Sequence, residues 1–307
     1  MNVLIIGLGS IARKHIEALQ VLKVNAKIYA LRSNADAEIV GEIENVYDLE
    51  NLNIDFDFAI ISNPTHLHYE FIEKLAKKNI PLFIEKPAVN TLEHVNQLVD
   101  IIESKKLITY VACNLRFHPC IVYLKNKINS GILRVNELNV YCGSYLPDWR
   151  PGKDFRAIYS SNAKMGGGVH LDLFHELDYT TWLFGLPNKS KSYLRNSSSL
   201  AIDAIDYANY TLEYDRFTAN IILNYYRRKP KREIEIVLDE NTWTIDLIKN
   251  EVRNDNNECL FKTSNFNVKD TYVLQLEYFI NSLKSKETPM NSFKDSLEIL
   301  KICLNGG

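Results

Sequence analysis

The chain has 307 residues, of which 46% are hydrophobic and 24% are charged. This balance excludes a disordered chain, because it supplies enough apolar side chains for large cores. Lysine and arginine number 36 against 38 acidic residues, for a formal charge of −2, which disfavours nucleic acid as a partner. The sequence shows no signal-peptide pattern and no apolar run near the about 20 residues of a membrane span. Its five scattered cysteines favour reduced thiols, so we expect a cytoplasmic protein without a membrane partner.

The first part of the chain alternates short apolar runs, typical of buried strands, with stretches that have helical spacing. The expected strands are Val3–Ile6, Lys27–Leu31, Phe56–Ser62, Pro81–Glu85 and Ile108–Cys113. The expected helices are residues 11–22, 70–78 and 92–105. Strands separated by helices of this length predict right-handed βαβ units and a doubly wound parallel sheet over residues 1–117.

From residue 118 to 307 the pattern changes to strands with short links. The expected strands are Asn136–Tyr145, Asp206–Tyr214, Thr218–Tyr226, Glu233–Asp239 and Thr242–Ile248. The expected helices are residues 169–183, 271–284 and 292–304. Consecutive strands with short turns predict an α+β domain with a large, mostly antiparallel sheet. The last helices are free to pack back on the first domain.

A glycine-rich turn joins the first expected strand to the first expected helix. Residues 7–12 read Gly-Leu-Gly-Ser-Ile-Ala and match the G-x-G-x-x-G/A pattern. Gly7 permits the tight turn, Gly9 lets a pyrophosphate approach the backbone, and Ala12 lets the helix pack closely. The N–H groups at the helix start, including those of Ser10 and Ile11, then face the phosphates. The turn therefore predicts a dinucleotide site, the alternative being a small-residue turn without a ligand.

The residues after the second expected strand bear on cofactor choice. An NAD site usually has an acidic residue about 20 positions beyond the glycines, to hold the ribose 2′-hydroxyl. Here the chain has Arg32 and Ser33, with no acid until Asp36. A guanidinium and a hydroxyl suit a 2′-phosphate, so NADP(H) is favoured over NAD(H). The alternative is a solvated arginine at a strand end.

A second motif, Glu85-Lys86-Pro87, ends the fourth expected strand, at the edge where doubly wound folds bind ligands. Pro87 stiffens the turn, so that the Lys86 ammonium can be aimed at a ligand. With the motifs Gly7–Ala12, Asn63–His68, Glu85–Pro87 and Gly166–Asp178 in this order, the chain resembles the glucose–fructose oxidoreductase / inositol dehydrogenase / MocA (Gfo/Idh/MocA) family. The likeness extends over nearly the whole chain.

The resemblance implies a Rossmann domain, a second domain for substrate binding and oligomerisation, and hydride transfer between a nicotinamide cofactor and a sugar or sugar derivative. It implies cofactor contacts by residues in four short segments of the chain. They are Asn63, Pro64, Thr65 and His68; Glu85 and Lys86; Asn114 and Arg116; and Trp149 and Arg150. The resemblance also makes Asp172 the substrate-binding carboxylate, His175 the catalytic histidine and Lys86 a further substrate contact.

The chemistry of these residue types agrees. Oxidising a secondary alcohol needs a base for the hydroxyl proton, and histidine can serve because it titrates near neutral pH. A nearby lysine stabilises the oxyanion. On a continuous helix His175 would lie one turn from Asp172 and from Asp178. Many family members have four steps between the aspartate and the histidine, whereas here there are three and Glu176 fills the fourth. Either His175 or Glu176 therefore occupies the catalytic position, and both are expected to contact the substrate.

The segment 145–152, including Tyr145 as a substrate contact, looks similar to members linked with bacterial surface-sugar synthesis. An acidic or nucleotide-linked sugar is therefore the expected substrate. Alternatives are an NAD-dependent glycoside hydrolase of the same family and a non-catalytic dinucleotide-binding protein.

No metal is expected. The resemblance implies a homodimer or homotetramer, and the basic run 227–232 is either a solvated hairpin end or a rim that attracts an anionic substrate.

Overall fold

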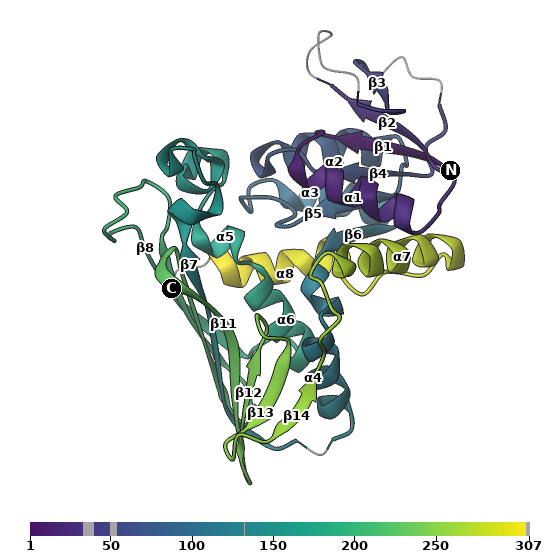
Figure 1. Cartoon of the computed structure of the whole chain (residues 1–307). Coiled ribbons are helices and arrows are strands. Elements are labelled where there is room, and N and C mark those ends of the chain that lie inside the picture. The colour runs from purple at the N-terminus through teal and green to yellow at the C-terminus, as the bar shows by residue number, and fades with distance from the viewer. Residues whose placement is uncertain (33–39, 50–53, 132, 305–307) are drawn as a thin grey trace. The chain divides into compact units, whose positions relative to one another are not determined.

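The computed structural model describes residues 1–32, 40–49, 54–131 and 133–304. The chain divides into two compact units (Figure 1). Unit 1 contains Met1–Asn114 and Lys269–Leu297, and unit 2 contains Leu115–Val268 and the described residues from Glu298 onward. The expected boundary lay at residue 117, with the last helices free to pack on the first domain, and the segment 269–297 is part of unit 1.

Unit 1 is built on a six-stranded parallel sheet with the order β3-β2-β1-β4-β5-β6. Its strands are β1 (Asn2–Ile6), β2 (Lys27–Leu31), β3 (Glu44–Val46), β4 (Phe58–Ile61), β5 (Leu82–Glu85) and β6 (Thr109–Ala112). The order runs outward in both directions from β1, so ligands are expected at the carboxyl ends of β1 and β4, where the winding reverses. The predicted doubly wound sheet is confirmed.

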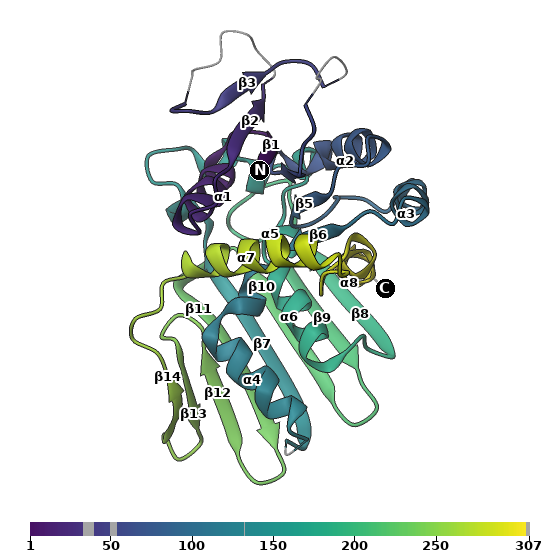
Figure 2. The ribbon, with the colours of Figure 1, turned by 90° about the vertical axis from the view of Figure 1, so that its right-hand side faces the viewer.

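Helices cover both faces of this sheet (Figure 2). Helices α1 (Ser10–Val21) and α7 (Asp270–Ser285) pack on one face, and α2 (His68–Lys77) and α3 (Val95–Ser104) lie on the other. The side chain of Phe279 in α7 is fully buried and meets the rings of Phe58 and Phe83 edge-on, with ring centroids 5.3 and 5.4 Å apart. Burying one such ring contributes about 1.5–3 kcal/mol, which explains why α7 belongs to unit 1.

Unit 2 is built on an eight-stranded sheet with the order β14-β13-β12-β11-β7-β10-β9-β8. Its strands are β7 (Val135–Tyr145), β8 (Lys189–Arg195), β9 (Tyr207–Glu213), β10 (Thr218–Asn224), β11 (Tyr226–Leu238), β12 (Thr242–Asp246), β13 (Glu251–Asn254) and β14 (Cys259–Lys262). Strands β7 and β10 pair in parallel and the other neighbours pair antiparallel. The predicted, mostly antiparallel second sheet is confirmed.

Helices α4 (Pro119–Asn129) and α6 (His175–Phe184) cover one face of this sheet (Figure 2). Buried and half-buried side chains alternate along β10, as a sheet with one covered face requires.

Helix α8 (Phe293–Leu304) begins in unit 1 and ends in unit 2. Single-turn 3-10 helices are Thr65–Leu67, Asn114–Phe117, Leu146–Trp149, Phe155–Ala157, Tyr159–Ser161 and Ala163–Met165. Of the helices in the described ranges, none is long and apolar enough to cross a membrane.

The helix predicted over residues 169–183 is two helices in the structure. Helix α5 (Val169–Asp172) ends before Leu173, whose φ and ψ are −99° and 35°, and α6 starts at His175. Leu173 and Phe174 between them are both buried. Tertiary packing therefore interrupts the helix, although no proline or glycine marks the break in the sequence.

Candidate functional site

The glycine-rich turn lies at the carboxyl end of β1 and opens α1. Gly7 has a φ of +85°, and a Cβ there would lie 2.7 Å from the Cα of Asn63 on the neighbouring loop. Glycine is therefore required by the protein itself at this position. A Cβ on Gly9, the N-cap residue, would meet no heavy atom within 4 Å, and its side chain supplies no cap hydrogen bond. The uncapped N–H groups of Ser10, Ile11 and Ala12 thus border open space, as a bound pyrophosphate requires.

A pocket of about 420 Å³ lies beside this turn in unit 1. It is lined by Ile6, Gly7, Leu31, Arg32, Tyr47, Asp48, Leu49, Asn63, Pro64, Leu67, Phe71 and Lys74. Arg32 and Lys74 supply positive charge, and Nη1 of Arg32 is buried with no hydrogen-bond partner in the described part of the chain. Ser33, the other expected 2′-phosphate contact, lies outside the described residues. The pocket has the position, at the ends of β1, β2 and β4, of an adenosine site in this fold.

Sequence reasoning missed three polar contributors to this pocket. Tyr47 and Asp48 follow β3, a three-residue strand with too short a pattern to be recognised. Lys74 lies on α2 and pairs with Glu70, four residues before it, over 2.6 Å, a spacing that is typical of a surface ion pair. In each case the fold, rather than a local motif, brings the side chain to the pocket.

The segment after β4 contains the expected contacts Asn63, Pro64, Thr65 and His68. Both polar atoms of the Asn63 amide are buried, and within the described ranges they have no hydrogen-bond partner. Such an amide is costly unless a ligand or water satisfies it. His68 is buried, and its ring nitrogens lie 2.9 Å from the carbonyl oxygen of Asn63 and 3.2 Å from that of Ala88. Burial lowers the pKa of His68. A neutral ring has one N–H and therefore donates to only one of these two carbonyls.

Glu85 and Lys86 follow β5 at the same sheet edge. Oε1 of Glu85 lies 2.6 Å from Nε2 of His15, a fully buried histidine on α1, and Oε2 accepts a hydrogen bond from the Lys86 backbone N–H over 3.3 Å. His15 was not anticipated, and its only sequence signal was a polar residue on an otherwise apolar helix face. Glu85 thereby connects α1, which opens with the phosphate turn, to the backbone of the half-buried Lys86.

Asn114, another expected cofactor contact, is buried in unit 1. Its Nδ2 donates a hydrogen bond to Oγ1 of Thr271 at the start of α7, over 2.6 Å. This contact joins the chain after β6 to α7 and uses one of the two amide hydrogens.

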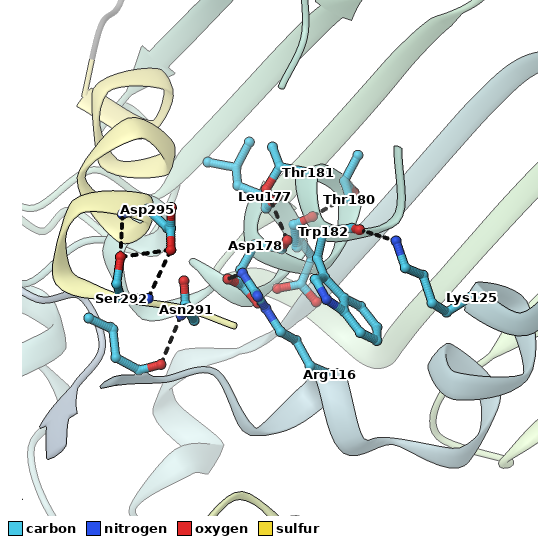
Figure 3. Close-up of polar contacts among 12 residues, drawn as sticks. Arg116, Lys125, Leu177, Asp178, Thr180, Thr181, Trp182, Asn291, Ser292 and Asp295 are labelled. Atoms are coloured by element: carbon cyan, nitrogen blue, oxygen red, sulfur yellow. Dashed lines mark hydrogen bonds and ion pairs between the residues drawn. The ribbon is translucent and has the colours of Figure 1, made fainter. Parts of the chain in front are cut away.

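Arg116 lies in unit 2 and forms a buried ion pair with Asp178 of α6 (Figure 3). Its Nε and Nη2 donate to the two carboxylate oxygens over 3.0 and 2.7 Å, and the side chains are 3% and 0% exposed. The guanidinium also lies 5.7 Å from the ring centroid of Trp182. Breaking such a pair typically costs about 3–5 kcal/mol. The geometry therefore suits Arg116 to holding α6 in place rather than to a direct cofactor contact.

Asp172 ends helix α5, and its Oδ2 accepts a hydrogen bond from the hydroxyl of the buried Tyr225 over 2.5 Å. His175 is half-buried at the start of α6. Because Leu173 and Phe174 interrupt the helix, the shared helical face expected for Asp172 and His175 does not exist. Tyr225 was missed, since only the tertiary fold brings the end of β10 to Asp172.

Glu176 has a different environment from His175. Its carboxylate is fully buried and accepts hydrogen bonds from Nε and Nη2 of Arg232 over 2.6 and 3.1 Å. Both oxygens are thus occupied by a guanidinium from β11, which leaves Glu176 poorly suited to contact a substrate. Of the two candidates for the catalytic position, the half-buried His175 has the more accessible side chain.

The glycine run before α5 serves an internal contact. A Cβ on Gly167 would overlap the carbonyl oxygen of Tyr159. The Tyr159 hydroxyl in turn donates to the carbonyl of Gly166 over 2.7 Å. The glycine run therefore allows a close approach between backbone segments of unit 2.

The remaining expected contacts, Tyr145, Trp149 and Arg150, lie at the carboxyl end of β7. The Trp149 ring is 36% exposed, meets the Tyr225 ring edge-on at 5.3 Å, and donates from Nε1 to Oγ of Ser144 over 2.8 Å. Arg150 is exposed. Tyr145, Trp149 and Asp172 thus gather around Tyr225 in unit 2. Over the described residues, no group of three or more His, Cys, Asp or Glu side chains could hold a metal ion.

A doubly wound parallel sheet with a glycine-rich phosphate turn and an adjoining pocket defines a dinucleotide-binding protein. Residues 1–113 match the family model described as "Oxidoreductase family, NAD-binding Rossmann fold", GFO_IDH_MocA. This match places residues 1–113 in the Gfo/Idh/MocA family, as the motifs suggested.

Similar proteins support the family and the fold. The Rhizopine catabolism protein MocA of Rhizobium meliloti is 26% identical over 59% of this chain and 56% of that protein. The Myo-inositol 2-dehydrogenase of Thermotoga maritima is 23% identical over 96% of this chain and 92% of its own length. Against the first curated relatives the chain spans about half of their length. The WlbA dehydrogenase of Bordetella pertussis, solved with NADH and UDP-GlcNAcA, has a TM-score of 0.83 at 18% identity, over 98% of this chain and 93% of that one, and shares the fold.

Proposed function

We propose that the protein is an NAD(P)-dependent oxidoreductase that transfers hydride between a nicotinamide cofactor and a CH–OH group of a sugar or sugar derivative. The observation that carries this proposal is the phosphate turn of unit 1. There the helix start is uncapped, the space beside Gly9 is open, and the buried amide of Asn63 has no partner in the described ranges. These features fit a dinucleotide, which supplies the hydride donor or acceptor when bound.

The chain's own residues would bind the substrate and move its proton. His175 would take the hydroxyl proton during oxidation and return it during reduction. Lys86 would stabilise the developing oxyanion, because an ammonium held by the turn after β5 needs little reorganisation. Asp172, which Tyr225 holds by a hydrogen bond to Oδ2, would accept a hydrogen bond from a sugar hydroxyl.

NADP(H) is the proposed cofactor. Two cations, Arg32 and Lys74, line the pocket beside the phosphate turn, and Nη1 of Arg32 has no partner among the residues that the structure describes. A 2′-phosphate would satisfy it with a charge-assisted hydrogen bond. Asp48 lines the same pocket, so the ribose 2′-hydroxyl of NAD(H) also has a hydrogen-bond acceptor there. The preference for NADP(H) therefore rests on the positive charge of Arg32 and Lys74.

The proposed substrate class is an acidic or nucleotide-linked sugar. The solved structure of WlbA with UDP-GlcNAcA supports this class as one that the shared fold accommodates.

We also propose a homodimer or homotetramer through the sheet of unit 2. The face that α4 and α6 leave open in Figure 2, the exposed Tyr193 and the half-buried Tyr207 support pairing there.

The function is tested by following absorbance at the reduced-nicotinamide band while a panel of neutral, acidic and nucleotide-linked sugars is added with each cofactor. We expect the Lys86→Ala variant still to bind cofactor and to lose about 10²-fold or more in kcat. The matched control is Lys77→Ala, which removes an exposed lysine of α2 that pairs with Glu73 over 2.9 Å.

Turnover that survives Lys86→Ala would contradict the proposed role of Lys86. Cleavage of a glycoside without net change in the nicotinamide absorbance would identify the glycoside hydrolase alternative instead. Cofactor binding without turnover of any sugar class would favour the non-catalytic alternative.

A further inference from the structure

Tyr225, the residue after β10, joins three segments of unit 2. Its backbone carbonyl accepts the N–H of Leu146 over 2.8 Å, which fixes the start of the turn Leu146–Trp149. Its hydroxyl donates to Asp172 at the end of α5. Its ring meets the Trp149 ring edge-on, with the two centroids 5.3 Å apart. One tyrosine therefore holds both the Asp172 carboxylate and the Trp149 ring.

Trp149 and Asp172 contact the covered face of the second sheet. Alternate residues of a strand share one face of a sheet. The buried apolar side chains along β7 are Leu138, Val140 and Cys142. Ser144 continues this series, and its Oγ accepts a hydrogen bond from Nε1 of Trp149 over 2.8 Å. Tyr225, which bonds to Asp172, follows the buried Leu223 of β10 at the same spacing. The two side chains are therefore on the face that α6 covers and not on the open face.

The Trp149 ring is restrained before any ligand binds. Leu146, which begins its turn, is fully buried, and the bond from Nε1 and the contact with Tyr225 fix the ring itself. A restrained ring loses little side-chain freedom when a ligand packs on it. Trp149 is nevertheless 36% exposed. Because its one polar side-chain atom already has an acceptor, the surface that the side chain offers is apolar.

The accessible groups of this cluster are the Trp149 ring and the Asp172 carboxylate. Tyr225 is fully buried, whereas Asp172 is half-buried. A ligand can therefore reach the ring and the carboxylate but not the tyrosine that holds them. Since both groups contact the same side chain, one sugar unit with its substituents can span them.

We infer that Trp149 is a platform on which the ring of the substrate sugar stacks while Asp172 accepts one of its hydroxyls. This inference rests on the proposed function and specifies its substrate as a sugar in ring form. A pyranose presents C–H groups on its face and hydroxyls at its edge, so an aromatic ring and a carboxylate bind complementary parts of it. An open-chain sugar has no rigid C–H face and loses more conformational freedom on binding. Trp149 is thus assigned to sugar specificity rather than to the cofactor contact that the resemblance implied.

The platform is tested by isothermal titration of four sugars into the full-length protein, with and without NADP⁺. Methyl glucoside and UDP-glucuronate are the ring forms, and glucitol and gluconate are the open-chain forms. We expect the ring forms to bind more tightly, and Trp149→Ala to weaken their binding about tenfold or more, because a buried aromatic contact is lost. Trp149→Phe should recover part of the loss, since it restores a smaller ring without the bond to Ser144.

The matched control is Phe261→Ala. This variant removes a half-buried ring of β14 that stacks on Tyr123 at a centroid distance of 4.9 Å, at the edge of the sheet. It deletes an aromatic contact of unit 2 away from Tyr225, so it should lower stability and change sugar affinity less than twofold. Circular dichroism and thermal melting of each variant check that the fold is intact.

Several outcomes overturn the platform. One is binding of the ring forms to Trp149→Ala as tight as to the unaltered protein, and another is equal weakening of ring and open-chain forms. A loss of NADP⁺ affinity with unchanged sugar affinity would assign Trp149 to the cofactor instead. Binding of none of the four sugars also overturns it.

The titration needs no turnover, so its outcome is separable from that of the proposed function. Trp149-dependent binding of ring-form sugars in a protein that never reduces or oxidises nicotinamide would leave the platform standing and refute the oxidoreductase. Turnover of a ring-form sugar with no effect of Trp149→Ala on KM would leave the oxidoreductase standing and refute the platform.

Discussion

The hydroxyl of Tyr225 donates a hydrogen bond to Oδ2 of Asp172 over 2.5 Å. Burial, followed by the charge of Asp172, raises the pKa of Tyr225 well above its usual value, so this hydroxyl stays protonated and donates. The bond fixes one carboxylate oxygen of a residue at the end of α5, next to the break before α6. Tyr225 thereby acts as a positioning residue for Asp172.

The Tyr225→Phe variant should therefore separate positioning from packing. It keeps the buried ring but removes a hydrogen bond to a charged group, which is worth about 1.5–3 kcal/mol. If Asp172 holds the substrate, KM should rise about tenfold or more while cofactor affinity stays constant. Steady-state kinetics with the active sugar and fluorescence titration of the cofactor measure these two effects.

Tyr210→Phe is the matched control for this prediction. The Tyr210 hydroxyl is also buried in unit 2 but donates to the carbonyl of Cys303 over 3.0 Å. This variant should lose stability without a change in KM. An equal rise of KM in both variants would show that Tyr225 acts only through the stability of the unit.

The buried pair of His15 and Glu85 should link stability to cofactor binding. In His15→Leu the Glu85 carboxylate loses its 2.6 Å partner, so we expect unit 1 to lose about 1–3 kcal/mol and cofactor affinity to fall. His15→Gln restores a donor and should recover part of both. Urea denaturation measures the stability, and a double-mutant cycle with Glu85→Gln should give a combined loss smaller than the sum. Additive losses would contradict a direct interaction.

Arg32 should set the preference between the two dinucleotides. In Arg32→Ala we expect the dissociation constant of NADPH to rise about tenfold or more, because a charge-assisted bond to the 2′-phosphate is lost, and that of NADH to stay within twofold. Fluorescence titration of both cofactors against the two proteins tests this. Tighter binding of NADH than of NADPH by the unaltered protein would refute the NADP(H) proposal.

Two buried histidines of unit 2 make its stability depend on pH. Burial lowers the pKa of His118 and that of His170 to about 4 from the usual 6.5. Nδ1 of His118 accepts the backbone N–H of Cys120 over 3.2 Å, so a proton there would break this helix cap. Between pH 6.5 and 4 the unfolded chain binds protons on these rings and the folded chain does not. Stability is therefore fully present above pH 6.5 and falls toward pH 4, by up to about 3 kcal/mol per histidine.

Urea denaturation at pH 7, 6 and 5 measures this slope, which should be positive with pH. His118→Asn should flatten it, because this variant removes one of the two titrating rings. A free energy of unfolding that is constant over this range would contradict the prediction. Acidic groups such as Asp246, whose pKa is lowered despite burial by its bonds to Lys249, contribute only below this window.

The hydrophobic pattern predicted both sheets, because the burial of a strand determines the order of apolar and polar residues along that strand. The short run of β1 and the residues Gly7–Ala12 predicted the phosphate turn in the same way. The pattern could not predict the break between α5 and α6, since packing of Leu173 and Phe174 decides it. It also missed the strand character of residues 226–232, whose charges resemble a loop although β7 supplies pairing partners.

The linear order of residues was thus enough to indicate the family, to predict the class of fold and to propose the side chains that carry chemistry. Glycine geometry, strand periodicity and residue type act over a few neighbouring positions. The partners of those side chains were decided only by folding: Tyr225 for Asp172, His15 for Glu85, Arg232 for Glu176 and Asp178 for Arg116. Such contacts join segments tens of residues apart, and the physical reason is that a buried polar group without a partner is costly, so folding brings partners together from distant parts of the chain.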